Sequence, residues 1–137
     1  MPRLPLIACF TFLSFAATER SSAQTANTAC EWGLLAAIQV FEKECRPDDR
    51  GEYRLALDEA VAVLEKRTAE LGTVPDFEPD RMRETAEEFF RQNPAQCQRG
   101  DVFEMAQLAR IKGVALLRQI VSKNLAVPRE KQTTECL

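Results

Sequence analysis

Four cysteines set the strongest constraint on what this chain can fold into. Cys30, Cys45, Cys97 and Cys136 are spread over the chain, and a fifth, Cys9, lies in an apolar N-terminal stretch. An even number of well-separated cysteines in a short chain is typical of proteins that mature in an oxidising compartment and are held by disulfides. We therefore expect two disulfides in the part of the chain that follows residue 23.

The N-terminal stretch, residues 1–23, has the three parts of a secretory signal peptide. Arg3 supplies a positive charge, residues 4–17 carry no charge, and Ser21 and Ala23 give the small-x-small pattern that precedes a cleavage site. The apolar run is shorter than the roughly 20 residues that a membrane-spanning helix needs, although a retained anchor and lipidation of the leader cysteine are alternatives. We expect cleavage after Ala23 and export of residues 24–137 to the periplasm or the extracellular space.

Residues 24–137 are predicted to form one all-α domain. Apolar residues recur at steps of three and four, which is the period of an amphipathic helix. The predicted helices begin near residues 28, 49, 79 and 102 and end near residues 46, 71, 93 and 125. Thr28 and Glu31 fit a capping box at the first helix, and Asp101 is expected to cap the fourth. Gly113 interrupts the fourth helix, and we expect a close helix crossing at this residue.

The helix order predicts how the cysteines pair. Cys30 and Cys45 lie at opposite ends of one predicted helix, roughly 22 Å apart, whereas a disulfide requires Cα atoms within about 7 Å. Short connections favour an antiparallel four-helix bundle, in which successive helices run in alternating directions. Cys45 and Cys97 then lie at one end of the bundle and Cys30 and Cys136 at the other. We predict Cys45–Cys97 and Cys30–Cys136, the second of which tethers the C-terminal tail.

The sequence lacks the usual equipment of an enzyme. It contains no histidine, no C-x-x-C motif and no glycine-rich phosphate loop, so we expect no catalytic residues and no cofactor. Acidic residues at 76, 78, 80 and 87 have the spacing of an EF-hand loop, but Arg81 occupies the position that requires glycine, so we expect no metal. A formal net charge of −3 without a basic stripe argues against nucleic acid as a partner.

Two charged segments are the candidate contact sites for a protein partner. Glu87, Glu88, Phe90 and Arg91 place an aromatic side chain on a charged face of the third predicted helix, which is typical of a binding hot spot. The turn Asp48-Asp49-Arg50 connects the first two predicted helices and is either a simple connector or a recognition loop.

These observations favour an exported, non-enzymatic protein-binding module, with an inhibitor or immunity protein of an envelope-acting enzyme as its best-defined form. The alternatives are a carrier of a small apolar ligand held between the helices, an envelope stress or chaperone-like factor, a carboxylate enzyme using Glu84, Glu87 and Glu88, or a secreted helical signal. We expect an unidentified protein partner and no stable membrane insertion, and the sequence does not predict an oligomeric state.

Overall fold

The structure, a computed structural model, describes residues 25–133 and Cys136, so the predicted signal peptide lies outside the described residues. The helices are α1 (Thr28–Cys45), α2 (Glu52–Leu71), α3 (Pro79–Gln92) and α4 (Asp101–Ala126), with short 3-10 helices η2 (Pro94–Cys97) and η3 (Arg129–Lys131). Within the described ranges there is no β-strand, only a parallel bridge between Ala26 and Gln132. The predicted all-α bundle is therefore confirmed.

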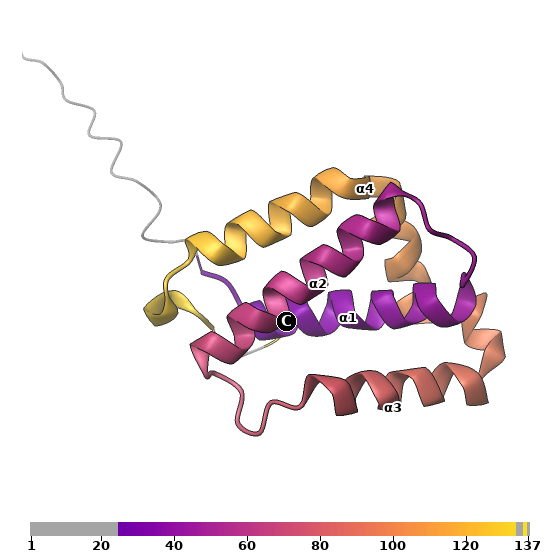
Figure 1. Cartoon of the computed structure of the whole chain (residues 1–137), viewed down its shortest axis with the longest axis horizontal. Helices are drawn as coiled ribbons and strands as arrows, with labels where there is room; N and C mark the ends of the chain where they lie inside the picture. Colours follow the sequence, from indigo (N-terminus) through magenta and orange to yellow (C-terminus); the bar gives the residue numbers. More distant parts are fainter. Residues whose placement is uncertain (1–24, 134–135, 137) are drawn as a thin grey trace, which may run out of the picture.

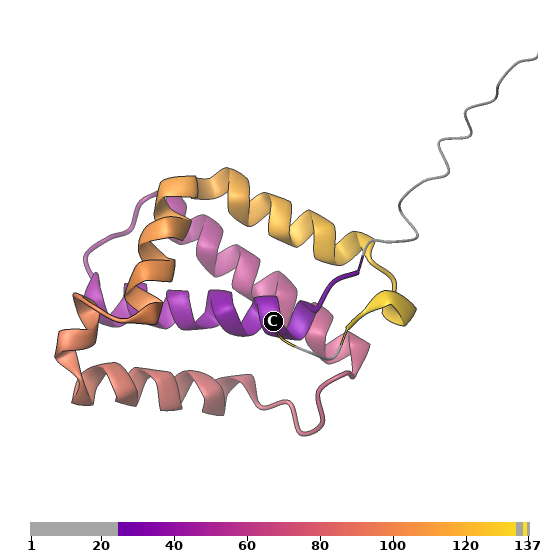
Figure 2. The same ribbon diagram turned by 180° about the vertical axis from the view of Figure 1, so that it is seen from behind.

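Helix α1 is the centre of the bundle and packs against the three other helices. Helices α2 and α4 lie together on one side of it and α3 runs along the opposite side (Figures 1 and 2). Eight of the eighteen residues of α1 are buried, and Trp32, Leu35, Ile38 and Phe41 among them are almost fully enclosed. In contrast, Phe90 is the one buried residue of the fourteen in α3, so most of the surface of α3 is left to face outward.

The two disulfides pair as the helix order predicts. Cys45 and Cys97 have Cα atoms 5.4 Å apart and join the end of α1 to η2, directly after α3. Cys30 and Cys136 have Cα atoms 5.6 Å apart and fasten the C-terminal tail to the start of α1. Polar contacts hold the same tail, because Thr133 N donates to Ala26 O (2.8 Å) and Thr28 N donates to Gln132 Oε1 (3.1 Å).

The predicted helix caps were wrong. Asn27 caps α1, and its side chain accepts a hydrogen bond from Cys30 N at 3.0 Å. Thr28 and Glu31 turn instead toward α4, where Thr28 Oγ1 lies 3.0 Å from Asn124 Oδ1 and Glu31 accepts from Lys123 at 2.9 Å. These contacts between distant segments compete with a local capping box and replace it. At α4, the preceding glycine is the N-cap, and the predicted cap Asp101 is the first helical residue.

Gly113 divides α4 into two segments that run in different directions (Figure 2). Its φ of 72° and ψ of −162° lie in a region that is essentially open only to glycine. A Cβ atom at this position would meet no atom within 4 Å, so the predicted close helix crossing was wrong. The glycine is needed for its backbone conformation, which redirects the helix.

No helix in the part of the chain that the structure describes is long and apolar enough to cross a membrane.

Candidate functional site: the two flanks of helix α3

A groove of about 710 Å³ lies between α1, α2 and α3 and is open to the surface. Most of its lining is charged, with three basic side chains and five acidic ones: Asp58, Glu65, Asp80, Glu84 and Glu87. The groove exists because α3 packs on α1 and leaves a gap beside α2, which the long polar side chains of all three helices line.

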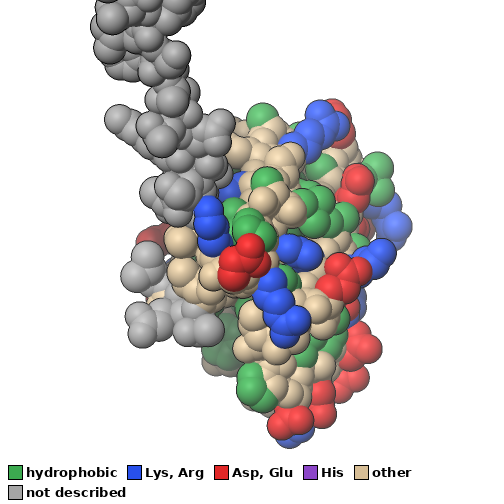
Figure 3. Space-filling view, turned by 90° about the vertical axis from the view of Figure 1, so that its left-hand side faces the viewer, with side chains coloured by type: hydrophobic (Ala, Val, Ile, Leu, Met, Phe, Trp, Pro, Cys, Tyr) green, Lys and Arg blue, Asp and Glu red, His purple; other side chains and the backbone are tan. Residues whose placement is uncertain are grey.

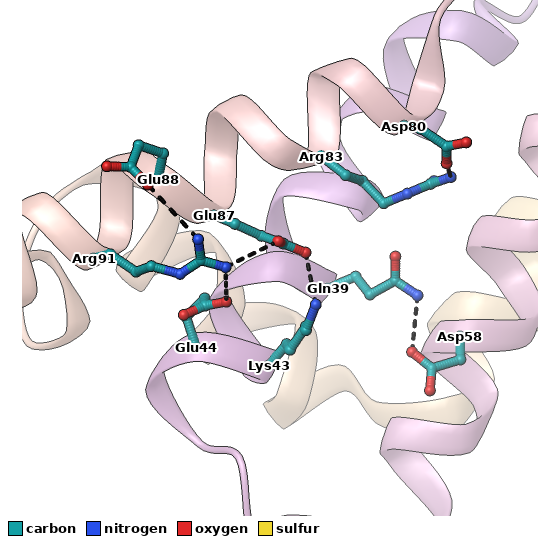
Figure 4. A network of polar contacts seen from close by, with 9 residues as sticks. All are labelled: Gln39, Lys43, Glu44, Asp58, Asp80, Arg83, Glu87, Glu88 and Arg91. Atoms are coloured by element: carbon teal, nitrogen blue, oxygen red, sulfur yellow. Dashed lines mark hydrogen bonds and ion pairs between the residues drawn. The ribbon is translucent and has the colours of Figure 1, made fainter.

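The predicted residues Glu87, Glu88 and Arg91 come together at one end of this groove (Figure 4). Lys43 Nζ donates to Glu87 Oε1 at 2.7 Å, and Arg91 lies 3.1 Å from Glu87 and 3.6 Å from Glu88. Arg91 also lies 3.5 Å from Glu44 of α1. The hydrogen bond from Lys43 is the main reason that the pKa of Glu87 is below its usual value. Glu87 is therefore ionised at neutral pH, which does not suit it to act as a general acid.

The other end of the groove ties α3 to α2 through Arg83. Its guanidinium pairs with both oxygens of Glu65 and lies 2.7 Å from Asp80. The hydrogen bond to Glu65 is the main reason that the pKa of Arg83 is above its usual range. Glu65 also accepts a hydrogen bond from Trp32 Nε1 at 3.2 Å. The ion pairs of Glu65 and Glu87 join α3 to α2 and to α1, so the charged side chains of the groove serve to connect the helices.

The two phenylalanines of α3 differ in burial. Phe90, the predicted contact residue, is only 4% exposed, and its ring meets that of Phe41 edge-on with centroids 5.8 Å apart. Phe89 is 46% exposed. Successive residues in a helix point about 100° apart, so one phenylalanine faces α1 and its neighbour faces outward. The prediction that Phe90 lies at a contact surface was wrong because Phe90 is buried, and the exposed aromatic side chain of α3 is Phe89.

The Asp48-Asp49-Arg50 turn contains one residue with a clear structural task. Asp49 pairs with Arg110 at 2.5 Å, and its Oδ1 accepts from Gly51 N at 3.1 Å. That backbone hydrogen bond, followed by the contact with Arg110, holds the pKa of Asp49 below its usual value. Arg110 also pairs at 2.6 Å with Glu42, which is fully buried. Asp49 thus fastens the turn to α4, while Asp48 and Arg50 are exposed.

Helix α3 also carries apolar side chains that are exposed. Met82 is 51% exposed and, like Phe89, is not part of the lining of the charged groove. The two residues are seven positions apart, which places them on one helix face. The clue in the sequence is register, because Ala86 and Phe90 are four apart and already fill the face toward α1.

No family model matches this chain, and comparisons with curated proteins and with solved structures return no match. A helical bundle does not define an activity, so function has to be inferred from the surface of the molecule itself.

Proposed function

We propose that this chain is an exported, non-enzymatic protein-binding module of the periplasm and that α3 is its recognition element. The observation that carries the proposal is the way in which α3 is displayed. Only one of its fourteen residues is buried, so a continuous outer surface two to three turns long is available to a partner. The best-defined form of this function is an inhibitor or immunity protein that blocks an envelope-acting enzyme.

Helix α3 is held firmly at both ends although little of it is buried. The Cys45–Cys97 disulfide fixes the chain just after its C-terminal end. Before its N-terminal end, the ring of Phe77 packs edge-on against Trp32 with centroids 4.9 Å apart. A binding element that is already ordered loses little conformational entropy when a partner docks, which increases the affinity that the same contacts provide.

The outer surface of α3 also has the composition of a contact site. Phe89 is a half-exposed aromatic side chain, and aromatic residues are enriched among those that dominate binding energy. Glu84 and Glu88 are exposed on the same helix, and charges around an apolar contact speed and orient association.

The carrier alternative is not favoured by the packing. The groove of about 710 Å³ is open to the surface and lined mainly by charged side chains, whereas sites for apolar ligands are mostly apolar and enclosed.

The proposal is tested by capture from an envelope extract of the source organism with immobilised, oxidised residues 24–137. We expect the wild type to retain one protein at near-equal stoichiometry and the variant Glu88→Lys/Phe89→Ser to lose it. The matched control is Glu104→Lys/Ile111→Ser, which changes exposed residues of the same types on α4 and should retain the partner. Equal capture by the two variants, or no capture by the wild type, contradicts the proposal.

A further inference from the structure

An apolar strip runs along the seam between α1 and α3, beside the charged groove, and its hollow shares Val40 and Arg83 with that groove. It consists of Gly33, Leu34 and Ala37 from α1 and Met82, Ala86 and Phe89 from α3. Three of these side chains are substantially exposed: Leu34 (39%), Met82 (51%) and Phe89 (46%). The remaining members are small, and together with Met82 they line a hollow of about 200 Å³ between the two helices. The lining of this hollow is completed by Trp32, Ala36, Val40 and Arg83.

The hollow is a consequence of small residues on α1. Gly33 is helical, and a Cβ atom placed on it would meet nothing within 4 Å. Because Gly33 and Ala37 provide little side-chain bulk, space for one aliphatic side chain is left beside Met82. The strip is about two helical turns long, since residues 82 and 89 are separated by roughly 10 Å along the helix axis.

The segment of chain that borders the strip has a negative net charge. Residues 76–92 contain six acidic residues and three arginines, so this segment has a net charge of −3, while the acidic and basic residues of the rest of the chain balance one another. Each arginine is already ion-paired within the molecule, Arg81 with Glu78, Arg83 with Asp80 and Arg91 with Glu88. In Figure 3, acidic side chains outnumber basic ones in the lower part of the molecule, where α3 and the loop before it lie.

We infer that the apolar strip and its acidic border dock a cationic amphipathic helix of another protein. This inference rests on the proposed function and specifies its partner. Apolar side chains of the partner at positions i, i+3 or i+4, and i+7 match the length of the strip and place one residue in the hollow. Lysine or arginine side chains beside that apolar face then lie against Glu84 and Glu88, which are exposed and line a shallow surface hollow together with Phe89 of the strip.

The charge of the border selects this occupant over two others. A second copy docked face to face through α3 would bring two segments of net charge −3 together, and like charges across an interface are strongly unfavourable. A bilayer surface is usually anionic and repels the same border. A positively charged helix satisfies both the apolar strip and the acidic residues around it.

The test uses a fluorescein-labelled, 18-residue Leu/Lys peptide with one apolar helical face, titrated into oxidised residues 24–137 and followed by fluorescence anisotropy. Two control peptides are a Leu/Glu version and a Leu/Lys version of the same composition with its apolar face scrambled. We expect binding of the first peptide alone, weakening as salt is raised. The variant Met82→Ser/Phe89→Ser should lower its affinity at least tenfold, and Glu84→Gln/Glu88→Gln should reduce the salt dependence.

The matched control is Leu108→Ser/Ile111→Ser, which removes two exposed apolar side chains from α4 and should leave the affinity unchanged. Circular dichroism and mass spectrometry establish that each variant is folded and retains its disulfides. Equal binding by the Met82/Phe89 and Leu108/Ile111 variants, or equal binding of the scrambled peptide, overturns the inference. So does a wild-type dimer in sedimentation that the Met82/Phe89 variant abolishes. If the extract experiment still shows capture that depends on α3, the proposed function survives while the cationic-helix partner is rejected.

Discussion

Loss of the Cys45–Cys97 disulfide should destabilise the protein more than loss of Cys30–Cys136, although it closes the shorter loop. The bonded residues are 52 and 106 positions apart in the sequence, respectively. Loop-closure entropy alone gives about 4 kcal/mol for the first disulfide and about 5 kcal/mol for the second. The structure reverses this order, because the two disulfides restrain parts of the fold that differ in how firmly they are packed.

The tail is able to detach while the four helices remain packed. It is held by about three hydrogen bonds, from Thr28 N to Gln132, from Thr133 N to Ala26 and from Gln132 Nε2 to Val127 O, at roughly 1 kcal/mol each. Ordering residues 128–133 opposes folding by roughly 1 kcal/mol for each residue. Without the disulfide, release of the tail is therefore favourable by about 3 kcal/mol. This offsets part of the loop-closure term of about 5 kcal/mol, so the free energy of unfolding should fall by only about 2 kcal/mol. Helix α3 has no such freedom, because its release exposes Phe90.

The measurement is urea unfolding of the oxidised variants Cys45→Ser/Cys97→Ser and Cys30→Ser/Cys136→Ser, followed by circular dichroism. We expect losses of about 4 and about 2 kcal/mol, with similar denaturant slopes if both remain two-state. Hydrogen exchange should show faster exchange of α3 amides in the first variant alone. An equal or larger loss on removing Cys30–Cys136, or unchanged protection of α3 in the first variant, would refute this reasoning.

Three further predictions concern single positions. Phe90→Ala should lower the free energy of unfolding by about 3–5 kcal/mol because it empties the contact with Phe41, and a loss below about 1 kcal/mol in urea unfolding would show that the ring is not buried. Gly113→Ala should lower the free energy of unfolding by about 1–3 kcal/mol because the residue has a positive φ. Gly33→Ala should raise it by up to about 1 kcal/mol, because Gly33 lies in a regular helix with open space around it. We expect Tm to fall for the first variant and to rise for the second. The pKa of Glu87 in the folded protein is below its ordinary value of 4.5, so its ion pair stabilises the fold above about pH 4.5. This contribution is at most about 1 kcal/mol, and it is lost as the pH falls through the pKa of the folded protein. An NMR titration should show that Lys43→Met raises this pKa, and an unchanged midpoint would contradict the assignment.

The fold and the disulfide pairing were predictable because they depend on coarse features of the sequence. The number of helices and the alternation of their directions decide which cysteines meet, and an error of three residues at a helix end does not alter the result. The second helix, for example, was expected from residue 49 and begins at Glu52. Cys45 and Cys97 nevertheless lie at the same end of the bundle.

Details that depend on contacts between distant residues were not predictable. Thr28 has the local pattern of a capping residue, but its hydroxyl bonds to Asn124, 96 positions away. The bend at Gly113 was missed because apolar spacing continues on both sides of it and gives no sign of a change in direction. The sequence around Asp49 indicates a solvent-exposed turn residue, and only the structure shows its ion pair with Arg110.

The candidate site was predicted in part. Glu87 and Arg91 are four residues apart, so their pairing follows from helical geometry, but Lys43 enters the same network from another helix. The choice between Phe89 and Phe90 was wrong because α3 has few apolar residues, and two adjacent phenylalanines do not reveal which of them faces α1. The apolar strip depends equally on small residues of α1, which a single-helix pattern does not show.

The Cys30–Cys136 disulfide has a mechanical consequence. Tension applied to the segments flanking these two cysteines passes from one to the other through the covalent bond and bypasses the helices between them. The bond spans 106 positions of sequence, a length that would extend by roughly 350–380 Å if it were pulled straight. While the disulfide is intact, the chain between the two cysteines cannot be extended, and the helices bear almost none of the applied force. A reductant would turn the same protein from a short, stiff link into a long and extensible one.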